Sequence, residues 1–211
     1  DPRRIDEWCS IGPKAVLMTG FFREWLQQHF SDARYVESPE LRGQLWTATH
    51  AERAAGGLDG SAGVLVESVT RWKPESTENR PAILIRRDDW ADVKGGIGDR
   101  LQGDLDLTGR EHYATFVRGS HTLFCVARLG QEAEILAGEV YREFQQFGPA
   151  IRHALNLLSF RAAGCSKIGR LEEAAQTHVV AVTVGYAFEE KWQLITHAPV
   201  LRRIVLSKLL P

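Results

Sequence analysis

Histidine is the side chain that most often performs acid–base or metal chemistry near neutral pH, and this chain has seven. None has the H-x-x-x-H or H-E-x-x-H spacing that places two imidazoles on one helical face. His112 and His121 would face each other across a predicted hairpin, but no third ligand is identifiable. The sequence therefore predicts no metal site and no cofactor. The seven are His29, His50, His112, His121, His153, His178 and His197.

Two neighbouring carboxylates occur in RRDDW, where Asp88 and Asp89 lie at the end of a predicted strand. Adjacent strand residues point to opposite faces, which suits neither a paired acid and base nor a single metal ion. We interpret this segment as a solvated, charged strand end. GGIGDR (Gly95–Arg100) resembles a phosphate-binding loop but lacks the Lys-Ser/Thr ending and a following helix. With no G-x-S-x-G or Ser-x-x-Lys motif either, the chain is not predicted to be an enzyme.

Composition narrows the classes of partner. The formal net charge is -1, from 26 basic and 27 acidic residues, so there is no global charge excess for nucleic acid or anionic membranes. No apolar run approaches the roughly 20 residues that span a bilayer. The opening DPRRIDEWCSIGPKAVL lacks the plan of a secretory signal, and three widely separated cysteines indicate neither disulfides nor zinc. We expect a cytoplasmic product. Two basic clusters, Arg161/Lys167/Arg170 and Arg202/Arg203/Lys208, are interpreted as solvated surface, with nucleic-acid contact as the alternative.

The elements that would position these residues follow from periodicity. Apolar residues at helical spacing predict a helix over Ala15–Phe30. VLVESVTRW (Val64–Trp72) and PAILIRRDDW (Pro81–Trp90) flank a polar insert and predict a hairpin. EHYATFVR and HTLFCVAR predict a second hairpin with its turn at Gly119–Ser120.

The second half continues with QEAEILAGEVYREFQQF, a predicted helix that Gly148-Pro149 should end. AIRHALNLLSF is ambiguous between helix and strand, with helix weakly favoured. HVVAVTVGYAF (His178–Phe188) alternates bulky and small residues and predicts a strand with two different faces, followed by a polar turn at EEKW. The pattern is typical of an α+β fold, a mainly antiparallel sheet of hairpins packed against a few amphipathic helices in a single domain, 1–211.

Residues 91–110 form a long glycine-rich loop that is either an arm ordered by a neighbouring subunit or a plain mobile loop. The small face of the His178–Phe188 strand likewise meets either another subunit or a second helix of the same chain. Tryptophan is enriched at interfaces as well as in cores. The candidate interface residues are therefore Trp72, Trp90, Gly95, Gly96, Gly98 and Arg100. A short strand near Leu45–Thr47 and a C-terminal helix in PVLRRIVLSKLLP complete the expected elements.

Three stretches, FFREWLQQHFSDARYVESPE, PAILIRRDDW with its glycine-rich sequel, and HVVAVTVGYAFEEKWQLITHAPVLRRI, carry a resemblance to a known family. In their order they resemble the tail-terminator and tail-completion (neck) proteins of tailed bacteriophages. The resemblance implies a small α+β subunit whose N-terminal helix packs on a sheet. It also implies that strands and long loops build a ring around a DNA-conducting channel, where the tail meets the head connector.

Two hypotheses of different classes follow. In the first, the chain is a virion structural protein, assembled in the host cytoplasm, that forms a cyclic homo-oligomer as a tail terminator or neck component. Its partners would be itself, virion proteins of the tail tube or connector, and DNA in passing, with no membrane contact. In the second, it is a small cytoplasmic enzyme or ligand-binding protein with a site near His112, His121 and Asp88. A ring subunit predicts partly apolar intersubunit surfaces, whereas an enzyme predicts a pocket with convergent titratable groups.

Overall fold

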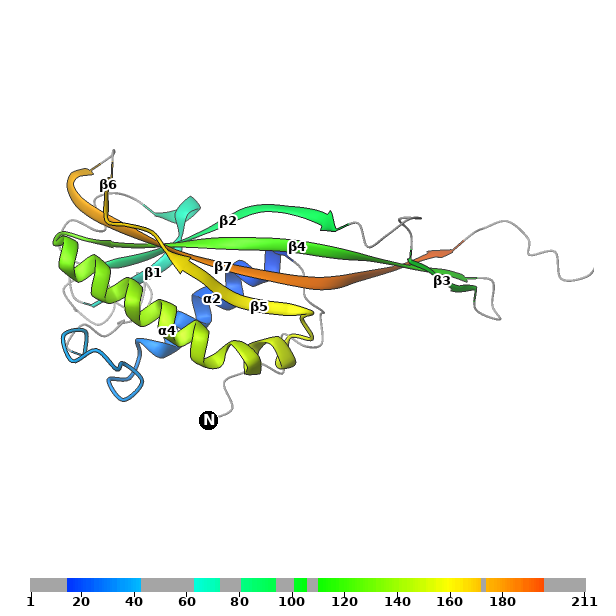
Figure 1. Cartoon of the computed structure of the whole chain (residues 1–211), viewed down its shortest axis with the longest axis horizontal. Helices are drawn as coiled ribbons and strands as arrows, with labels where there is room; N and C mark the ends of the chain where they lie inside the picture. The colour runs from blue at the N-terminus through cyan, green and yellow to red at the C-terminus, as the bar shows by residue number, and fades with distance from the viewer. Residues whose placement is uncertain are drawn as a thin grey trace, which may run out of the picture.

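The computed structural model describes residues 15–42, 63–72, 81–93, 101–105, 110–171 and 174–195. They form an α+β fold, as the sequence predicts, in which a mixed, mostly antiparallel sheet has the strand order β1-β2-β4-β7-β5 (Figure 1). Strand β3 pairs with β4, and β6 pairs with β7. The elements are α2 (Ala15–His29), β1 (Leu65–Ser68), a 3-10 turn η1 (Val69–Arg71), β2 (Ala82–Val93), β3 (Leu101–Leu105), β4 (Arg110–Ala127), α4 (Gly130–Ala154), β5 (Ser159–Cys165), β6 (Gly169–Leu171) and β7 (Ala174–Ile195).

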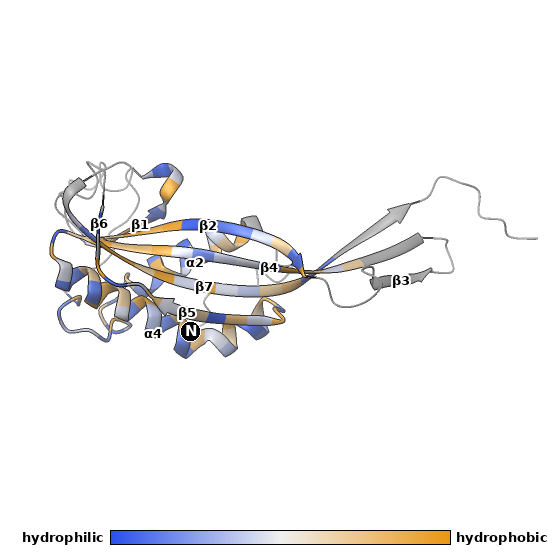
Figure 2. Ribbon diagram, turned by 45° about the horizontal axis from the view of Figure 1, so that its top comes forward, coloured by the Kyte–Doolittle hydropathy of each residue, from blue (hydrophilic) through white to orange (hydrophobic). Residues whose placement is uncertain are grey.

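Both helices cover the same face of the sheet. The predicted N-terminal helix is confirmed as α2, and its Phe22 ring is fully buried. That ring lies 4.9 Å from the imidazole of His121 on β4 and 5.4 Å from the ring of Phe144 on α4, between ring centroids. The core therefore lies between one sheet face and the helix pair, and Figure 2 shows how β2 changes from hydrophobic to hydrophilic along its length as it leaves this core.

The strand with two different faces is confirmed within β7. Its bulky residues are buried beneath the helices, whereas the interleaved small residues are only half-buried on the opposite face. In the described part of the chain neither helix lies on that small face. The buried set is Val180, Val182, Val184, Tyr186 and Phe188; the small set is Val179, Ala181, Thr183, Gly185 and Ala187.

The predicted hairpin around Gly119–Ser120 is wrong, because β4 runs through both residues without a turn. A Cβ placed on Gly119 would lie 2.9 Å from the hydroxyl oxygen of Tyr186 on the neighbouring strand. Glycine is present at this position because a buried tyrosine ring approaches the strand closely, and close approach of another group is a common reason for glycine inside a strand.

The predicted hairpin of Val64–Trp72 with Pro81–Trp90 is also wrong, since β1 and β2 pair in parallel, from Leu65 opposite Ala82 to Ser68 opposite Ile85. The turn η1 follows β1 directly. Side-chain alternation reports which face a residue occupies and carries no information on strand direction, so the pattern alone does not separate the two arrangements.

Two predicted breaks are absent. Helix α4 continues through Gly148-Pro149, because Ile151 is buried and the helix packs along β5. Packing on the sheet thus outweighs the hydrogen bond that the proline removes. The proposed turn at EEKW (Glu189–Trp192) is likewise wrong: β7 passes through it and pairs with β4 as far as Ile195.

The loop predicted over residues 91–110 is interrupted by strands. Ala91–Val93 belong to β2, Leu101–Leu105 form β3, and Arg110 begins β4. Gly95, Gly96, Gly98 and Arg100 lie outside the described residues, as do the predicted strand near Leu45–Thr47 and the C-terminal helix.

Candidate subunit interface

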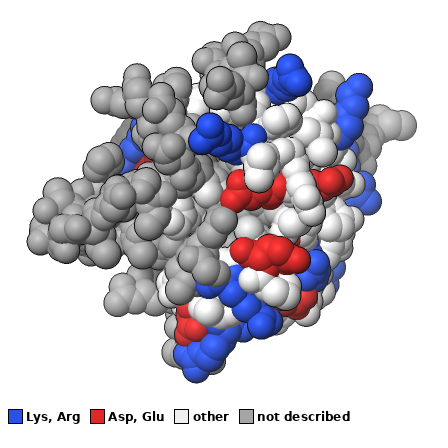
Figure 3. All heavy atoms as spheres, turned by 90° about the vertical axis from the view of Figure 1, so that its left-hand side faces the viewer, with Lys and Arg blue, Asp and Glu red and all other residues white. Residues whose placement is uncertain are grey.

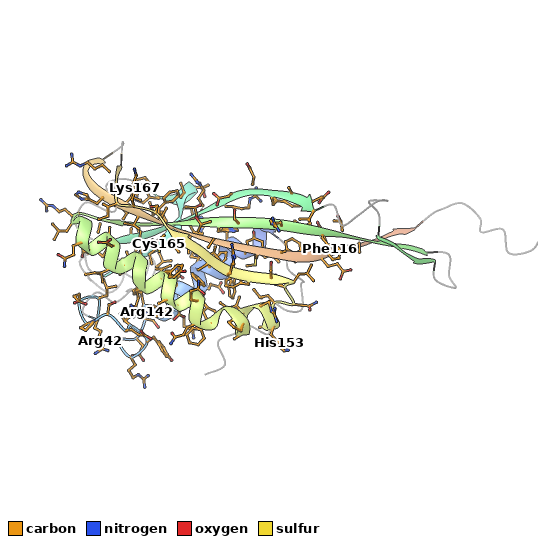
Figure 4. The ribbon with its side chains drawn as sticks, in the orientation of Figure 1. Arg42, Phe116, Arg142, His153, Cys165 and Lys167 are labelled. Carbon is orange, nitrogen blue, oxygen red and sulfur yellow. The ribbon has the colours of Figure 1, made fainter. Side chains whose placement is uncertain are left out.

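A ribbon of strands extends beyond the helices. β4 and β7 pair continuously from Arg110 opposite Ile195 to Ala127 opposite His178, and the buried pair Val117 and Phe188 marks the end of the core. Past this pair the two strands, joined by β3, continue away from both helices (Figure 1). Phe116, labelled in Figure 4, lies where the ribbon leaves the core. Two or three strands with no covering layer are marginally stable in water, so such a ribbon is best stabilised by a partner surface.

Among the described residues, the sheet face opposite the helices is covered only at one end. There, Trp72 follows the turn η1 and packs with Leu84 and Val126, so this tryptophan is a half-buried packing residue of the chain itself. Further along, the same face presents the small residues Thr183 and Gly185 of β7. Packing within the chain is thus enough to explain a tryptophan at position 72, which the sequence marks as a candidate interface residue.

The first open edge of the sheet belongs to β2. Because β1 ends opposite Ile85, the side of Arg86–Val93 that faces away from β4 has no partner strand among the described residues; we call it the β2 edge. Two large apolar side chains are exposed there, Trp90 at 47% and Val93 at 38%. Trp90, a candidate interface residue from the sequence, is therefore exposed to solvent on a strand with one unpaired side.

Charge on the β2 edge is unevenly neutralised. Asp88 accepts hydrogen bonds from the Thr122 hydroxyl at 2.7 Å and the Ser120 hydroxyl at 3.3 Å, and it pairs with Arg86 at 3.2 Å. Asp89 and Asp92 are exposed and have no partner in the part of the chain that the structure describes. Both aspartates lie within a register shift between Arg87 and Trp90, and β2 continues beyond them to Val93. The expected strand end is therefore wrong, and the expected exposure to solvent holds for Asp89 but not for Asp88.

The second open edge belongs to β5, which pairs with β7 on one side and with no described strand on the other; we call that free side the β5 edge. Large apolar side chains flank it, Leu158 at 50% exposure and Ile168 at 41%. Arg161 and Lys167 are exposed, and no carboxylate among the described residues pairs with them. Figure 4 shows Cys165 and Lys167 at the end of β5 that lies toward β6.

The structure does not assemble His112, His121 and Asp88 into one site. His112 lies on the same strand as His121, within the ribbon, so the two do not face each other across a hairpin. His121 points toward the helices: its Nε2 lies 2.8 Å from the Thr19 hydroxyl and its Nδ1 lies 3.2 Å from the Tyr186 hydroxyl. Asp88, bonded to the next residue of β4, lies on the opposite face of the sheet.

His121 is fully buried, and this burial is the largest influence on its pKa, which falls to about 4 even though the charge of Asp88 opposes the shift. The imidazole is therefore neutral at pH 7 and joins α2 to the sheet by hydrogen bonds. Such a group stabilises the packing of the helix and has no access to a substrate.

A second buried polar cluster joins α2 to α4, and no sequence motif indicates it. The His29 imidazole lies between two carboxylates, with Nε2 3.1 Å from Glu139 and Nδ1 3.1 Å from Glu143, the latter an ion-pair contact without hydrogen-bond geometry. The indole of Trp25 donates to Glu143 at 2.7 Å. Glu139 also accepts three hydrogen bonds from the turn that follows α2: from the backbone N–H groups of Glu37 and Ser38 and from the Ser38 hydroxyl.

Burial is the largest influence on the pKa of His29 and lowers it, but hydrogen bonds and charge interactions with Glu139 and Glu143 together outweigh burial and raise the pKa to about 9. Burial is likewise the largest influence on Glu139 and raises its pKa. The bonds from His29, Glu37 and Ser38 outweigh it and lower the pKa to about 2. The cluster is thus a buried triad of His29, Glu139 and Glu143 in which His29 and Glu139 are ionised and the groups bind one another, which suits a structural role.

Surface charge on the end of the molecule where α4 begins is mixed, with acidic and basic side chains interspersed among the described residues (Figure 3). Among the described residues no helix is long and apolar enough to cross a membrane, and no group of three His, Cys, Asp or Glu side chains is placed to hold a metal ion. No protein-family model matches the chain, and no curated protein matches it significantly.

Proposed function

We propose that the chain is a structural subunit that assembles with copies of itself into a ring at the head–tail junction or the tail end of a tailed bacteriophage. The observation that carries this proposal is the β4–β7 ribbon, which leaves the core and has no covering layer among the described residues. A subunit that works alone gains little from such a ribbon, whereas a neighbouring copy can cover it and thereby order both partners.

The buried titratable groups support a non-catalytic role. His121 and the His29 triad each bind their own helices and sheet, and both lie under the surface. A catalytic constellation needs groups that converge on a space where a substrate can bind. Among the described residues the polar groups instead converge on each other, as they do where helices are fixed to a sheet.

The place in the virion comes from the resemblance to tail-terminator and neck proteins, which the N-terminal helix on a sheet and the two-faced strand β7 fit. In that role the partners are other copies of the chain and proteins of the tail tube or connector, with DNA passing through the central channel. Catalysis is replaced by surface complementarity that closes a cyclic interface.

The test is negative-stain electron microscopy of the purified protein together with mass spectrometry of purified phage particles. The proposal predicts rings of uniform diameter and the chain as a component of particles, located at the head–tail junction or the tail end by antibody labelling. A protein that is present in infected cells, absent from particles and monomeric on the grid would overturn it.

A further inference from the structure

We propose that neighbouring copies join by β-strand pairing, in which the β2 edge (Arg86–Val93) of one copy pairs with the β5 edge (Ser159–Cys165) of the next. This inference rests on the proposed function only in assuming that the chain associates with itself. An unpaired strand edge presents a row of backbone donors and acceptors, and pairing with a second edge is the common way to satisfy them.

The order and direction of the strands allow the β2 edge of one copy to pair with the β5 edge of the next. β2 and β5 lie on opposite sides of the sheet (Figure 1), and β4 and β7 lie between them. Each of the three ladders that connect β2 to β5 is antiparallel, so the two strands run in opposite directions. A second copy placed beside the first with its sheet in the same orientation therefore brings β5 antiparallel to β2, in the same sense as the rest of the sheet.

Exposed apolar side chains are concentrated at the same two edges. Of the five large apolar residues that the described part exposes, Trp90 and Val93 lie on β2, and Leu158 and Ile168 flank β5. Only Leu129, before α4, lies elsewhere. Aromatic and aliphatic residues of this kind form the centre of protein interfaces, and pairing the two edges would remove four of the five from water.

Charge distinguishes the heterologous pairing from pairing of like edges. The β2 edge carries two arginines and three aspartates; Arg86 pairs with Asp88, so the exposed Arg87 stands against the exposed Asp89 and Asp92, and the edge is acidic by one charge. The β5 edge carries Arg161 with Lys167 beyond it, both exposed and with no carboxylate partner among the described residues. Two β2 edges would bring together two surfaces of net acidic charge, and two β5 edges would place basic groups together, which is unfavourable on adjacent strands. A β2 edge against a β5 edge brings opposite charges together.

The consequence is a head-to-tail contact in which each copy uses two different surfaces. An interface of this kind closes into a ring when its rotation permits and otherwise extends as a filament, whereas a contact between identical surfaces stops at a dimer. Edge pairing thus supplies the kind of contact that a ring subunit requires, and it joins the sheets of neighbouring copies into one continuous sheet.

The test exchanges the charges of the two edges. One variant, Asp89→Lys with Asp92→Lys, makes both edges basic; the other, Arg161→Glu with Lys167→Glu, makes both acidic. Each alone is expected to sediment as a monomer, with at least a tenfold loss of association. An equimolar mixture is expected to regain the assembly, because each basic edge then meets an acidic one. Recovery on mixing also shows that both variants are folded.

Three outcomes decide between the proposals. If both variants assemble as well as the unaltered protein, or if mixing restores nothing, the edge pairing is wrong while self-assembly stands. If the unaltered protein is itself monomeric, the proposed function is wrong, and the edge pairing, which assumes self-association, is wrong with it. Assembly that stops at a dimer contradicts the head-to-tail contact.

A cysteine cross-link gives a second readout that does not depend on charge. Cys165 is exposed on β5, and Cys125 is buried. In a Cys9→Ser background, Arg87→Cys, at the end of the β2 edge that comes opposite Cys165 when the two edges pair antiparallel, is expected to form disulfides with Cys165 of the next copy and to give a ladder of dimers, trimers and larger species under oxidation. The matched control Glu134→Cys, exposed on α4, should give none. A ladder from the control alone, or from neither variant in a protein that assembles, would contradict the pairing.

Discussion

The hydroxyl of Tyr186 lies 3.2 Å from Nδ1 of His121, and both side chains are buried where β4 and β7 pass beneath α2. Gly119, opposite Tyr186 in the ladder, gives the phenol ring its space. These three residues fix the sheet to the helix layer at the point where the ribbon leaves the core.

Replacing Gly119 with alanine should destabilise the fold. The added Cβ would lie 2.9–3.0 Å from the ring and hydroxyl of Tyr186, which is buried and stacked on Phe188, so the ring cannot move away cheaply. Overpacking of this kind costs roughly 1–3 kcal/mol. Chemical denaturation should show that loss for Gly119→Ala and little change for the control Gly185→Ala, whose Cβ meets nothing within 4 Å. Equal stability of the two variants would show that the ring has room.

Acid should weaken the fold through His121. Its pKa in the folded protein is about 4, below the ordinary 6.5, so the unfolded chain binds the proton more tightly. The contribution is therefore complete above pH 6.5 and is lost as the pH falls from 6.5 to 4. The variant His121→Gln should be less stable at pH 7 and should have a flatter profile in that window. An unchanged slope of unfolding free energy against pH would contradict the neutral buried imidazole.

Alkaline pH should weaken the fold through His29. Here the folded pKa of about 9 lies above the ordinary 6.5, so the stabilisation is complete below pH 6.5 and is lost as the pH rises through 9. Glu139, with its pKa lowered from 4.5 to about 2, loses its contribution only as the pH falls from 4.5 to 2. With His121, these shifts place the greatest stability near pH 6.5.

The variant His29→Gln leaves Glu139 and Glu143 buried without a positive partner between them and should cost roughly 3–5 kcal/mol. It should also remove the fall in stability between pH 6.5 and 9. His153→Gln, an exposed position near the end of α4, is the control and should change neither quantity. An alkaline slope that persists in His29→Gln would assign it to another group.

Trp90→Ala should weaken assembly without destabilising the monomer. The indole is 47% exposed on the β2 edge, so truncation removes little packing within one copy but a large contact between copies. The control Leu129→Ala removes a side chain that is 66% exposed and lies away from both edges. Analytical ultracentrifugation should show a shift to smaller species for Trp90→Ala alone; equal shifts in both variants would indicate general loss of apolar surface.

Several elements could be predicted because their signals are local. The apolar stripe of Ala15–Phe30 and the alternation in His178–Phe188 each report directly which side chains face a core, and both are confirmed. The direction of a strand and the residue at which a strand or helix ends depend instead on contacts with residues far away in the sequence. From the sequence, Gly119 predicts a turn, because the sequence does not show that Tyr186 needs space beside it. Pro149 likewise predicts a helix end, because the sequence does not show that Ile151 is buried.

The buried triad lay beyond prediction for the same reason. His29 and Glu139 are separated by 110 positions, and nothing in the residues around either one indicates that they meet. The edges are an intermediate case: Trp90 could be picked out by residue type, but its exposure depends on where β1 ends, and the role of Leu158 and Ile168 depends on β5 having a free side.

Self-assembly is the central claim, and multi-angle light scattering of the purified protein across a wide range of concentrations tests it most directly. The account predicts one species whose mass is an integer multiple, greater than two, of the protomer mass. A protein that keeps the protomer mass at every concentration would contradict it.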